Sequence, residues 1–87
     1  MKPGEDLIVQ GIADLEQGLE TIPSLLVSIG APRLRRIGLP IPENTFSDAE
    51  HRLYFLLAGI YDDGAHSKYN SYIRRLVSFE RAAECGI

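Results

Sequence analysis

The side chains best suited to bind a metal ion lie near the middle of the chain: His51, Asp62, Asp63 and His66. A zinc site needs three or four such ligands at about 2–2.3 Å from one ion. A turn at 62–64 would join two antiparallel helices, which leaves His51 about 18 Å along the helix axis from the turn, where His66 lies. The sequence therefore predicts no metal site and no cofactor within one chain. Only a dimer could bring the two histidines to one ion, and the protein would then be a metal-dependent enzyme.

Nucleophilic catalysis has no suitable pair of side chains. Cys85 is the only cysteine, and it follows a predicted helix whose C-terminal end carries partial negative charge, which disfavours a reactive thiolate. Ser67 is next to His66 in the sequence, but neighbouring helix residues point in different directions. The chain is therefore expected to have no catalytic residues and not to be an enzyme.

Aromatic and basic residues of the last predicted helix form the main candidate for binding a protein partner. Tyrosines are common where apolar surface meets water and are enriched in protein interfaces. The candidate contact residues are Tyr69, Tyr72, Arg74, Arg75, Phe79 and Arg81, with Arg33, Arg35 and Arg36 as a possible site for an anionic partner.

The same arginines support a second hypothesis, a regulator that binds nucleic acid, because arginine-rich faces contact phosphates. A helix–turn–helix can be drawn over 25–38 with Gly30 in the turn. Pro32 and the Arg35–Arg36 pair then occupy positions that its second helix needs for packing, so the motif is weak. The alternative to nucleic-acid binding is that these arginines form a solvated face without a ligand.

Glu80 is the least expected charge because it falls within the apolar arc of its helix. Two interpretations are open. It lies exposed where the helix extends beyond its neighbours, or it forms an ion pair that fixes the register of an interface. Its possible partners are Arg52, Arg33, Arg35 and Arg36.

The elements that carry these residues are predicted from apolar spacing. Alternating intervals of four and three residues indicate one face of an α-helix. Such a stripe spans 5–29 and consists of Ile8, Ile12, Leu15, Leu19, Ile22, Leu26 and Ile29. Pro23 interrupts it, so this segment is either one kinked helix or two helices, the second capped by Thr21. The unbroken phase favours nearly collinear halves.

The second half of the chain predicts a long helical hairpin, over about 47–61 and 64–84. Gly30 is a plausible end for the first segment, followed by a short turn at 31–37 and an extended crossing that Leu39 and Ile41 pin to the core. Ser47 and Glu50 form a capping box for the next helix. That helix is apolar on nearly every side and is expected to be the central one.

Length and composition bound the fold and the compartment. The chain has 87 residues, 45% of them hydrophobic, and a net charge of −3, which suit one small globular domain over 1–87 and exclude a strongly basic protein. Residues 1–30 carry one lysine and five acids, a balance of −4. No run is long enough to cross a membrane. Without a secretory signal or a second cysteine, a cytoplasmic protein is expected.

The sequence thus predicts an all-α protein, a small bundle of three to four helices. A second apolar stripe with the same spacing consists of Ala65, Tyr69, Tyr72, Leu76, Phe79 and Ala83. Two such stripes on so short a chain favour a homodimer that covers what one copy leaves exposed. The leading functional hypothesis is a non-enzymatic protein–protein interaction module, such as an adaptor, inhibitor or accessory subunit.

Overall fold

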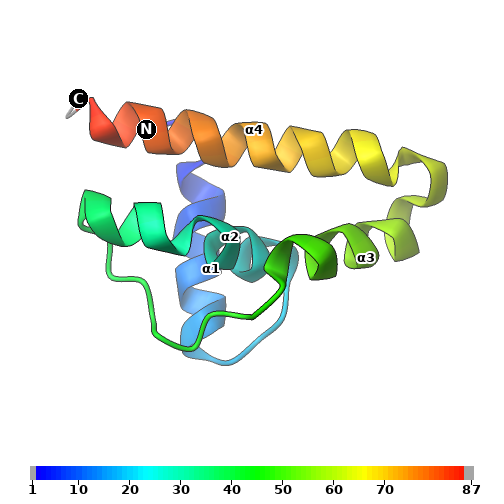
Figure 1. Cartoon of the computed structure of the whole chain (residues 1–87), viewed down its shortest axis with the longest axis horizontal. Coiled ribbons are helices and arrows are strands. Elements are labelled where there is room, and N and C mark those ends of the chain that lie inside the picture. The colour runs from blue at the N-terminus through cyan, green and yellow to red at the C-terminus, as the bar shows by residue number, and fades with distance from the viewer. Residues whose placement is uncertain (1, 86–87) are drawn as a thin grey trace.

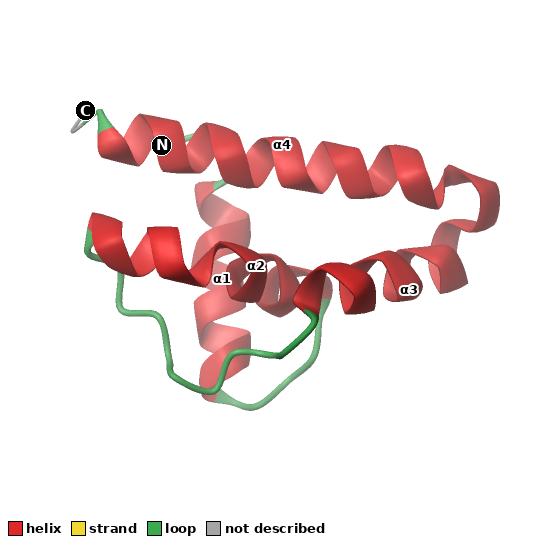
Figure 2. Cartoon of the chain, viewed as in Figure 1, coloured by secondary structure: helices red, strands yellow, loops and turns green. Residues whose placement is uncertain are grey.

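The structure, a computed structural model, describes residues 2–85 and confirms the all-α prediction. The helices are joined by turns and loops, and no strand occurs in this range (Figure 2). They are α1 (Glu5–Glu16), α2 (Ile22–Ile37), α3 (Ala49–Tyr61) and α4 (Ala65–Glu84), with a 3₁₀ turn at Asp62–Gly64. Over the same residues, no helix combines the length and the hydropathy needed to span a bilayer.

The long helix α4 organises the molecule. It runs along the whole length of the structure, with α3 beside its first half and α2 beside its second half (Figure 1). The helix α1 crosses behind α2. The helix α2 packs against all three other helices. The predicted hairpin of α3 and α4 is present, with the aspartates 62 and 63 in its turn.

The break between α1 and α2 settles the two alternatives for 5–29. The chain leaves the helix after Glu16, Gly18 adopts a left-handed conformation (φ 71°), and Thr21 caps α2 with Pro23 in its first turn. A single helix kinked at Pro23 is therefore wrong. The expectation of collinear halves is wrong as well, because α1 crosses α2 in Figure 1.

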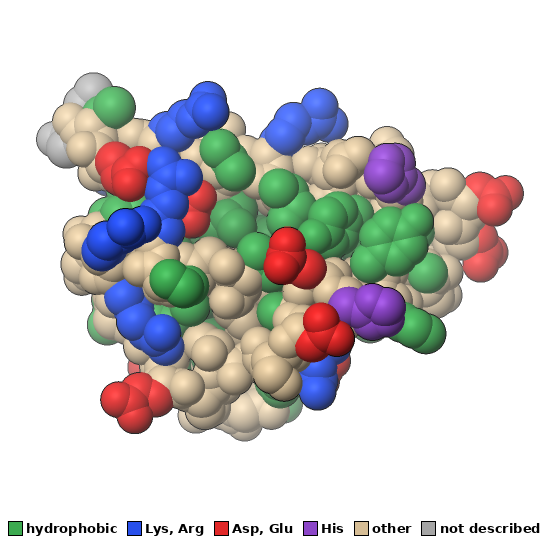
Figure 3. All heavy atoms as spheres, in the orientation of Figure 1, with side chains coloured by type: hydrophobic (Ala, Val, Ile, Leu, Met, Phe, Trp, Pro, Cys, Tyr) green, Lys and Arg blue, Asp and Glu red, His purple; other side chains and the backbone are tan. Residues whose placement is uncertain are grey.

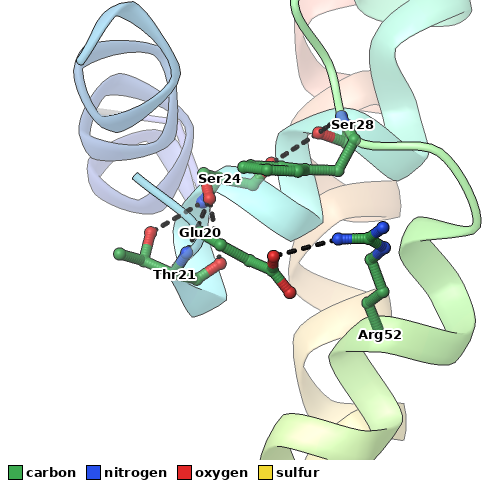
Figure 4. A network of polar contacts seen from close by, with 6 residues as sticks. Glu20, Thr21, Ser24, Ser28 and Arg52 are labelled. Carbon is green, nitrogen blue, oxygen red and sulfur yellow. Dashed lines mark hydrogen bonds and ion pairs between the residues drawn. The ribbon is translucent and has the colours of Figure 1, made fainter. Parts of the chain in front are cut away.

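Thr21 and Ser24 form the capping box of α2 (Figure 4). The Ser24 N–H donates to the Thr21 hydroxyl at 3.1 Å, and the Thr21 N–H donates to the Ser24 hydroxyl at 2.7 Å. The Thr21 hydroxyl also donates to Asp14 at 2.6 Å, which ties the cap to the end of α1. The cap thus fixes both the start of α2 and its contact with α1.

The helix α2 continues through Gly30 and Pro32 and ends at Gly38, whose φ is 108°. The predicted end at Gly30, the separate turn at 31–37 and the helix–turn–helix are therefore wrong. Gly30 is buried against α4, where a Cβ would lie 2.9 Å from Leu76 and 3.0 Å from Glu80. The absence of a side chain at Gly30 lets α2 lie close to the Leu76 and Glu80 side chains of α4, while Pro32 lies on the exposed side.

The start and the burial of α3 also differ from the prediction. Its N-cap is Asp48, with φ 54° and no side-chain hydrogen bond, so the capping box at Ser47 is wrong. Only Ala49, Leu53 and Leu57 of α3 are buried, whereas α2 buries seven residues and is the central helix. Although α3 is apolar on nearly every side, most of its surface is not covered by other helices.

The crossing between α2 and α3 is held to the core as predicted. Ile41 is buried and Leu39 is partly buried against the core. The Asn44 side chain donates to the carbonyl of Leu15 at 2.7 Å, which adds a polar anchor to the end of α1. These contacts make the crossing part of the packed structure.

Candidate interaction surface

The predicted contact residues of α4 divide between surface and core. Arg74, Arg75 and Arg81 are exposed, and the guanidinium of Arg75 lies 5.2 Å from the centre of the Tyr72 ring, a cation–π contact. Phe79, in contrast, is 4% exposed and belongs to the core. Its ring packs in the core on the inner side of α4, so the single chain does not offer it to a partner.

The three arginines of α2 do not form one site. Arg33 forms ion pairs with Glu80 (3.2 Å) and Glu84, Arg35 donates to the carbonyl of Pro42 at 2.7 Å, and Arg36 is exposed. Arg33 is therefore a link between α2 and α4. Only Arg36 is left with no polar contact within residues 2–85.

Glu80 is buried, at 4% exposure, so the exposed alternative is wrong. Its carboxylate forms an ion pair with Arg33, and this pair lies within one chain. Burial raises the pKa of the Glu80 carboxyl, against the opposing effect of Arg33. The hydrogen bond from Arg33 lowers the pKa of Glu84, and the same interaction raises the pKa of Arg33. The three groups fasten the end of α4 to α2.

The tyrosines on either side of the hairpin turn contact one another across α3 and α4. The ring centres of Tyr54 and Tyr69 are 5.7 Å apart, and those of Tyr54 and His66 are 6.4 Å apart. The amine of Lys68 lies 5.0 Å from the centre of the Tyr61 ring. Burial raises the pKa of Tyr69, with a further contribution from the charge of Glu50. The aromatic surface is thus held in place by contacts within the hairpin.

Most of the exposed large apolar side chains lie on α3, and the sequence prediction missed them. Residues 2–85 expose six large apolar side chains, of which four are on α3: Tyr54, Phe55, Ile60 and Tyr61. Hydrophobic side chains gather between the two histidines (purple), over the α3–α4 part of the molecule, in Figure 3. The signal was present in the run 53–61, but its all-round apolarity was interpreted as burial.

The two histidines are exposed on this hairpin, each in the first turn of its helix. His51 contacts the ring of Phe55 at 5.6 Å, and His66 lies within hydrogen-bond distance of Asn70 at 3.3 Å. Among residues 2–85, no three side chains of His, Cys, Asp or Glu gather closely enough to hold a metal ion.

Hollows of the surface border α4, and two of them matter here. One, of about 410 Å³, lies between α1, the end of α2 and α4, and is lined by Ile8, Val9, Ile12, Ile37, Leu39 and Phe79 among others. The other, of about 380 Å³, lies between α2 and α4, with Glu80 and Arg33 in its wall.

Comparison with known proteins adds no relative: no protein-family model, curated protein or solved structure matches the chain.

Proposed function

We propose that the chain is a small non-enzymatic protein–protein interaction module, such as an adaptor, inhibitor or accessory subunit, that acts in the cytoplasm and also self-associates. Its contact surface is the exposed side of the α3–α4 hairpin. The observation that carries this proposal is the gathering of Tyr54, Phe55, Ile60 and Tyr61 within eight residues of α3. Exposed aromatic and aliphatic surface of this kind is typical of interaction sites.

The composition of the hairpin surface suits a protein partner. Aromatic side chains are enriched in protein interfaces, and Tyr54, Tyr69 and Tyr61 are already ordered by ring or cation contacts. Ordering before binding reduces the entropy that binding costs. The Tyr72–Arg75 pair extends the same mixed aromatic and basic character along α4.

The test is a pull-down from native lysate with the wild type and two matched variants. Phe55→Ser removes the most exposed apolar side chain of α3, at 69%, and Val9→Ser removes one on α1 that is exposed by 60%. We expect a protein that is retained by the wild type and by Val9→Ser, with or without nuclease, and is lost with Phe55→Ser. Equal retention by both variants would contradict the proposed surface.

Nucleic-acid binding is the second candidate, and the exposed arginines favour it. Those with no hydrogen bond or ion pair within residues 2–85 are Arg36, Arg74, Arg75 and Arg81. In Figure 3 most of the basic side chains lie along the upper and left-hand edges of the molecule. Phosphate contacts weaken steeply with salt, by a log–log slope close to the number of contacts, whereas an apolar interface weakens little. Retention that nuclease abolishes, with such a salt slope, would replace the protein partner by a nucleic acid.

A further inference from the structure

The hollow of about 380 Å³ between α2 and α4 has a volume that suits a small molecule. Its apolar wall is formed by Ile29 of α2 and by Tyr69, Ile73, Leu76 and Val77 of α4. Three of these residues, Ile29, Tyr69 and Ile73, are only partly buried, so their side chains remain open to a ligand. Hydrophobic side chains also gather along the boundary between α4 and the helices below it in Figure 3.

The two carboxylates in the wall of the hollow lie toward opposite ends. Glu80 and Tyr69 are eleven residues apart on α4, about 16 Å along the helix, and the other apolar lining residues of α4 lie between them. Glu50 of α3 lies at the Tyr69 end, because its charge contributes to the raised pKa of Tyr69. The hollow therefore has an aliphatic middle and one carboxylate toward each end.

One oxygen of the buried Glu80 carboxylate is free to accept a hydrogen bond. Arg33 donates to Oε1 at 3.2 Å, whereas Oε2 accepts no hydrogen bond within residues 2–85 and is not shut off from solvent. Oε2 lies beside the bare backbone of Gly30, where a Cβ would be 3.0 Å away. A carboxylate oxygen with a free lone pair in an apolar hollow favours a ligand that donates N–H.

The charges around the hollow favour a cation. Arg33 pairs with both Glu80 and Glu84, so these three groups together carry one excess negative charge. Arg36, in the same wall, acts on Glu84, whose pKa its charge helps to lower. Glu50 forms no ion pair within residues 2–85. Three carboxylates and two arginines leave a balance of −1, and the unpaired negative charge is at the Glu50 end.

We propose that this hollow binds a linear aliphatic diamine, with one ammonium group at Glu80 and the other at Glu50. The methylene chain between them lies against Ile73 and Leu76 and loses its contact with water there. The Tyr69 hydroxyl is a further acceptor for the ammonium at the Glu50 end. The site goes beyond the proposed function, because it needs no protein partner and lies in the hollow between α2 and α4.

Isothermal titration calorimetry at pH 7 with diaminooctane and octylamine tests the proposal. The two probes have the same hydrocarbon chain and differ by one ammonium group. We expect diaminooctane to bind with a Kd of about 1 mM or below. Octylamine should bind at least about threefold more weakly, because it leaves one of the two carboxylates without a cation.

Glu50→Gln tests the exposed end of the site. The variant should bind diaminooctane about threefold more weakly and no longer distinguish it from octylamine, since the second ammonium has lost its partner. The matched control is Glu16→Gln, which removes an exposed carboxylate of α1 outside the hollow and changes the net charge equally. It should bind both probes like the wild type.

The pH dependence of binding tests the buried end. Burial raises the pKa of Glu80, so its carboxyl is protonated at a higher pH than an exposed one and then accepts no ammonium. Diaminooctane should therefore bind more tightly as the pH rises from about 5 to about 7. Glu80→Gln should bind the probe at least about tenfold more weakly at pH 7 and lose this dependence, because a neutral amide replaces the carboxylate.

Three results would each overturn the diamine site. They are no binding of diaminooctane up to about 10 mM, equal affinities of the wild type for the two probes, and equal effects of Glu50→Gln and Glu16→Gln. Phe55 does not line the hollow, so the pull-down with Phe55→Ser tests the proposed function independently.

Discussion

Glu80 has an environment that makes stability depend on pH. Burial raises the pKa of its carboxyl from the usual 4.5, with Arg33 opposing and Glu84 adding to the rise. The folded protein therefore holds this proton more tightly than the unfolded chain does. The stability that this group contributes is complete below the unfolded value of 4.5 and is lost as the pH rises through the folded-state pKa.

Glu80→Gln is neutral at every pH and removes this loss. We expect the free energy of unfolding of the variant, relative to the wild type, to increase as the pH rises from about 4 to about 7. Urea denaturation at several pH values measures it. The matched control is Glu84→Gln. Arg33 lowers the pKa of Glu84, so the stability from that carboxylate is lost as the pH falls, and its variant should show the opposite trend. Equal trends in both variants would contradict these assignments.

Gly11 is the closest contact between α1 and α2. A Cβ there would lie 2.4 Å from the Pro23 carbonyl oxygen and 2.4 Å from Val27 Cγ2. Gly11→Ala should lower the free energy of unfolding by about 1–3 kcal/mol, because the helices must move apart. Gly59→Ala, with open space at its Cβ, should raise it by about 0.5–1 kcal/mol in dilute solution. If urea denaturation shows both variants stabilised, the helix contact at Gly11 is not as close as described.

Individual side chains were predicted with uneven success. Arg33 was among the possible partners of Glu80 because only long cationic side chains can reach a carboxylate within an apolar arc. Choosing it among four arginines required the packing of α2 on α4, which brings together residues 47 positions apart. Phe79 was placed on a surface because the spacing of an apolar stripe does not say which part a neighbouring helix covers.

The cap of α2 determines where the second helix starts, and it suggests a sharp test. Thr21→Ala removes the hydroxyl that accepts from the Ser24 N–H and donates to Asp14. We expect a loss of about 2 kcal/mol in the free energy of unfolding, since a helix cap and a bond to a buried carboxylate are lost together. Thr21→Ser keeps the hydroxyl and should stay within about 0.5 kcal/mol of the wild type. Similar losses in both variants, measured in urea, would show that the hydroxyl is not what matters.

The elements were predictable as far as local chemistry decides them. The period of the apolar residues indicates helices, and the two aspartates with Gly64 mark the hairpin turn. The extent of α2 was not predictable, because Gly30 and Pro32 both favour an end locally. The packing of Gly30 on Leu76 and Glu80 outweighs that preference. The exposure of α3 was missed because apolarity on all sides does not reveal how many neighbours a helix has.

The molecule as a whole is unevenly packed. The region around α2 is covered by α1 and α4, whereas the hairpin end beyond it consists of two helices and the turn at Asp62–Gly64, where no residue is buried (Figure 1). Native-state hydrogen exchange in dilute solution should show the amides of 58–68 opening at a lower free energy than those of 24–34. Uniform protection of both segments would mean that the chain unfolds only as one unit.

The ion pair between Arg33 and Glu84 has a consequence for the chain while it is being synthesised. The helices α1 and α2 contact each other through residues close in sequence, so they can pair while synthesis is still in progress. Arg33, however, meets its partner 51 residues later. Until the ribosome has released α4, this guanidinium and the apolar side of α2 that packs against α4 face the solvent. The packing of α2 on α4 is therefore completed only after Glu84 has left the ribosome, and the nascent chain carries an open surface until then.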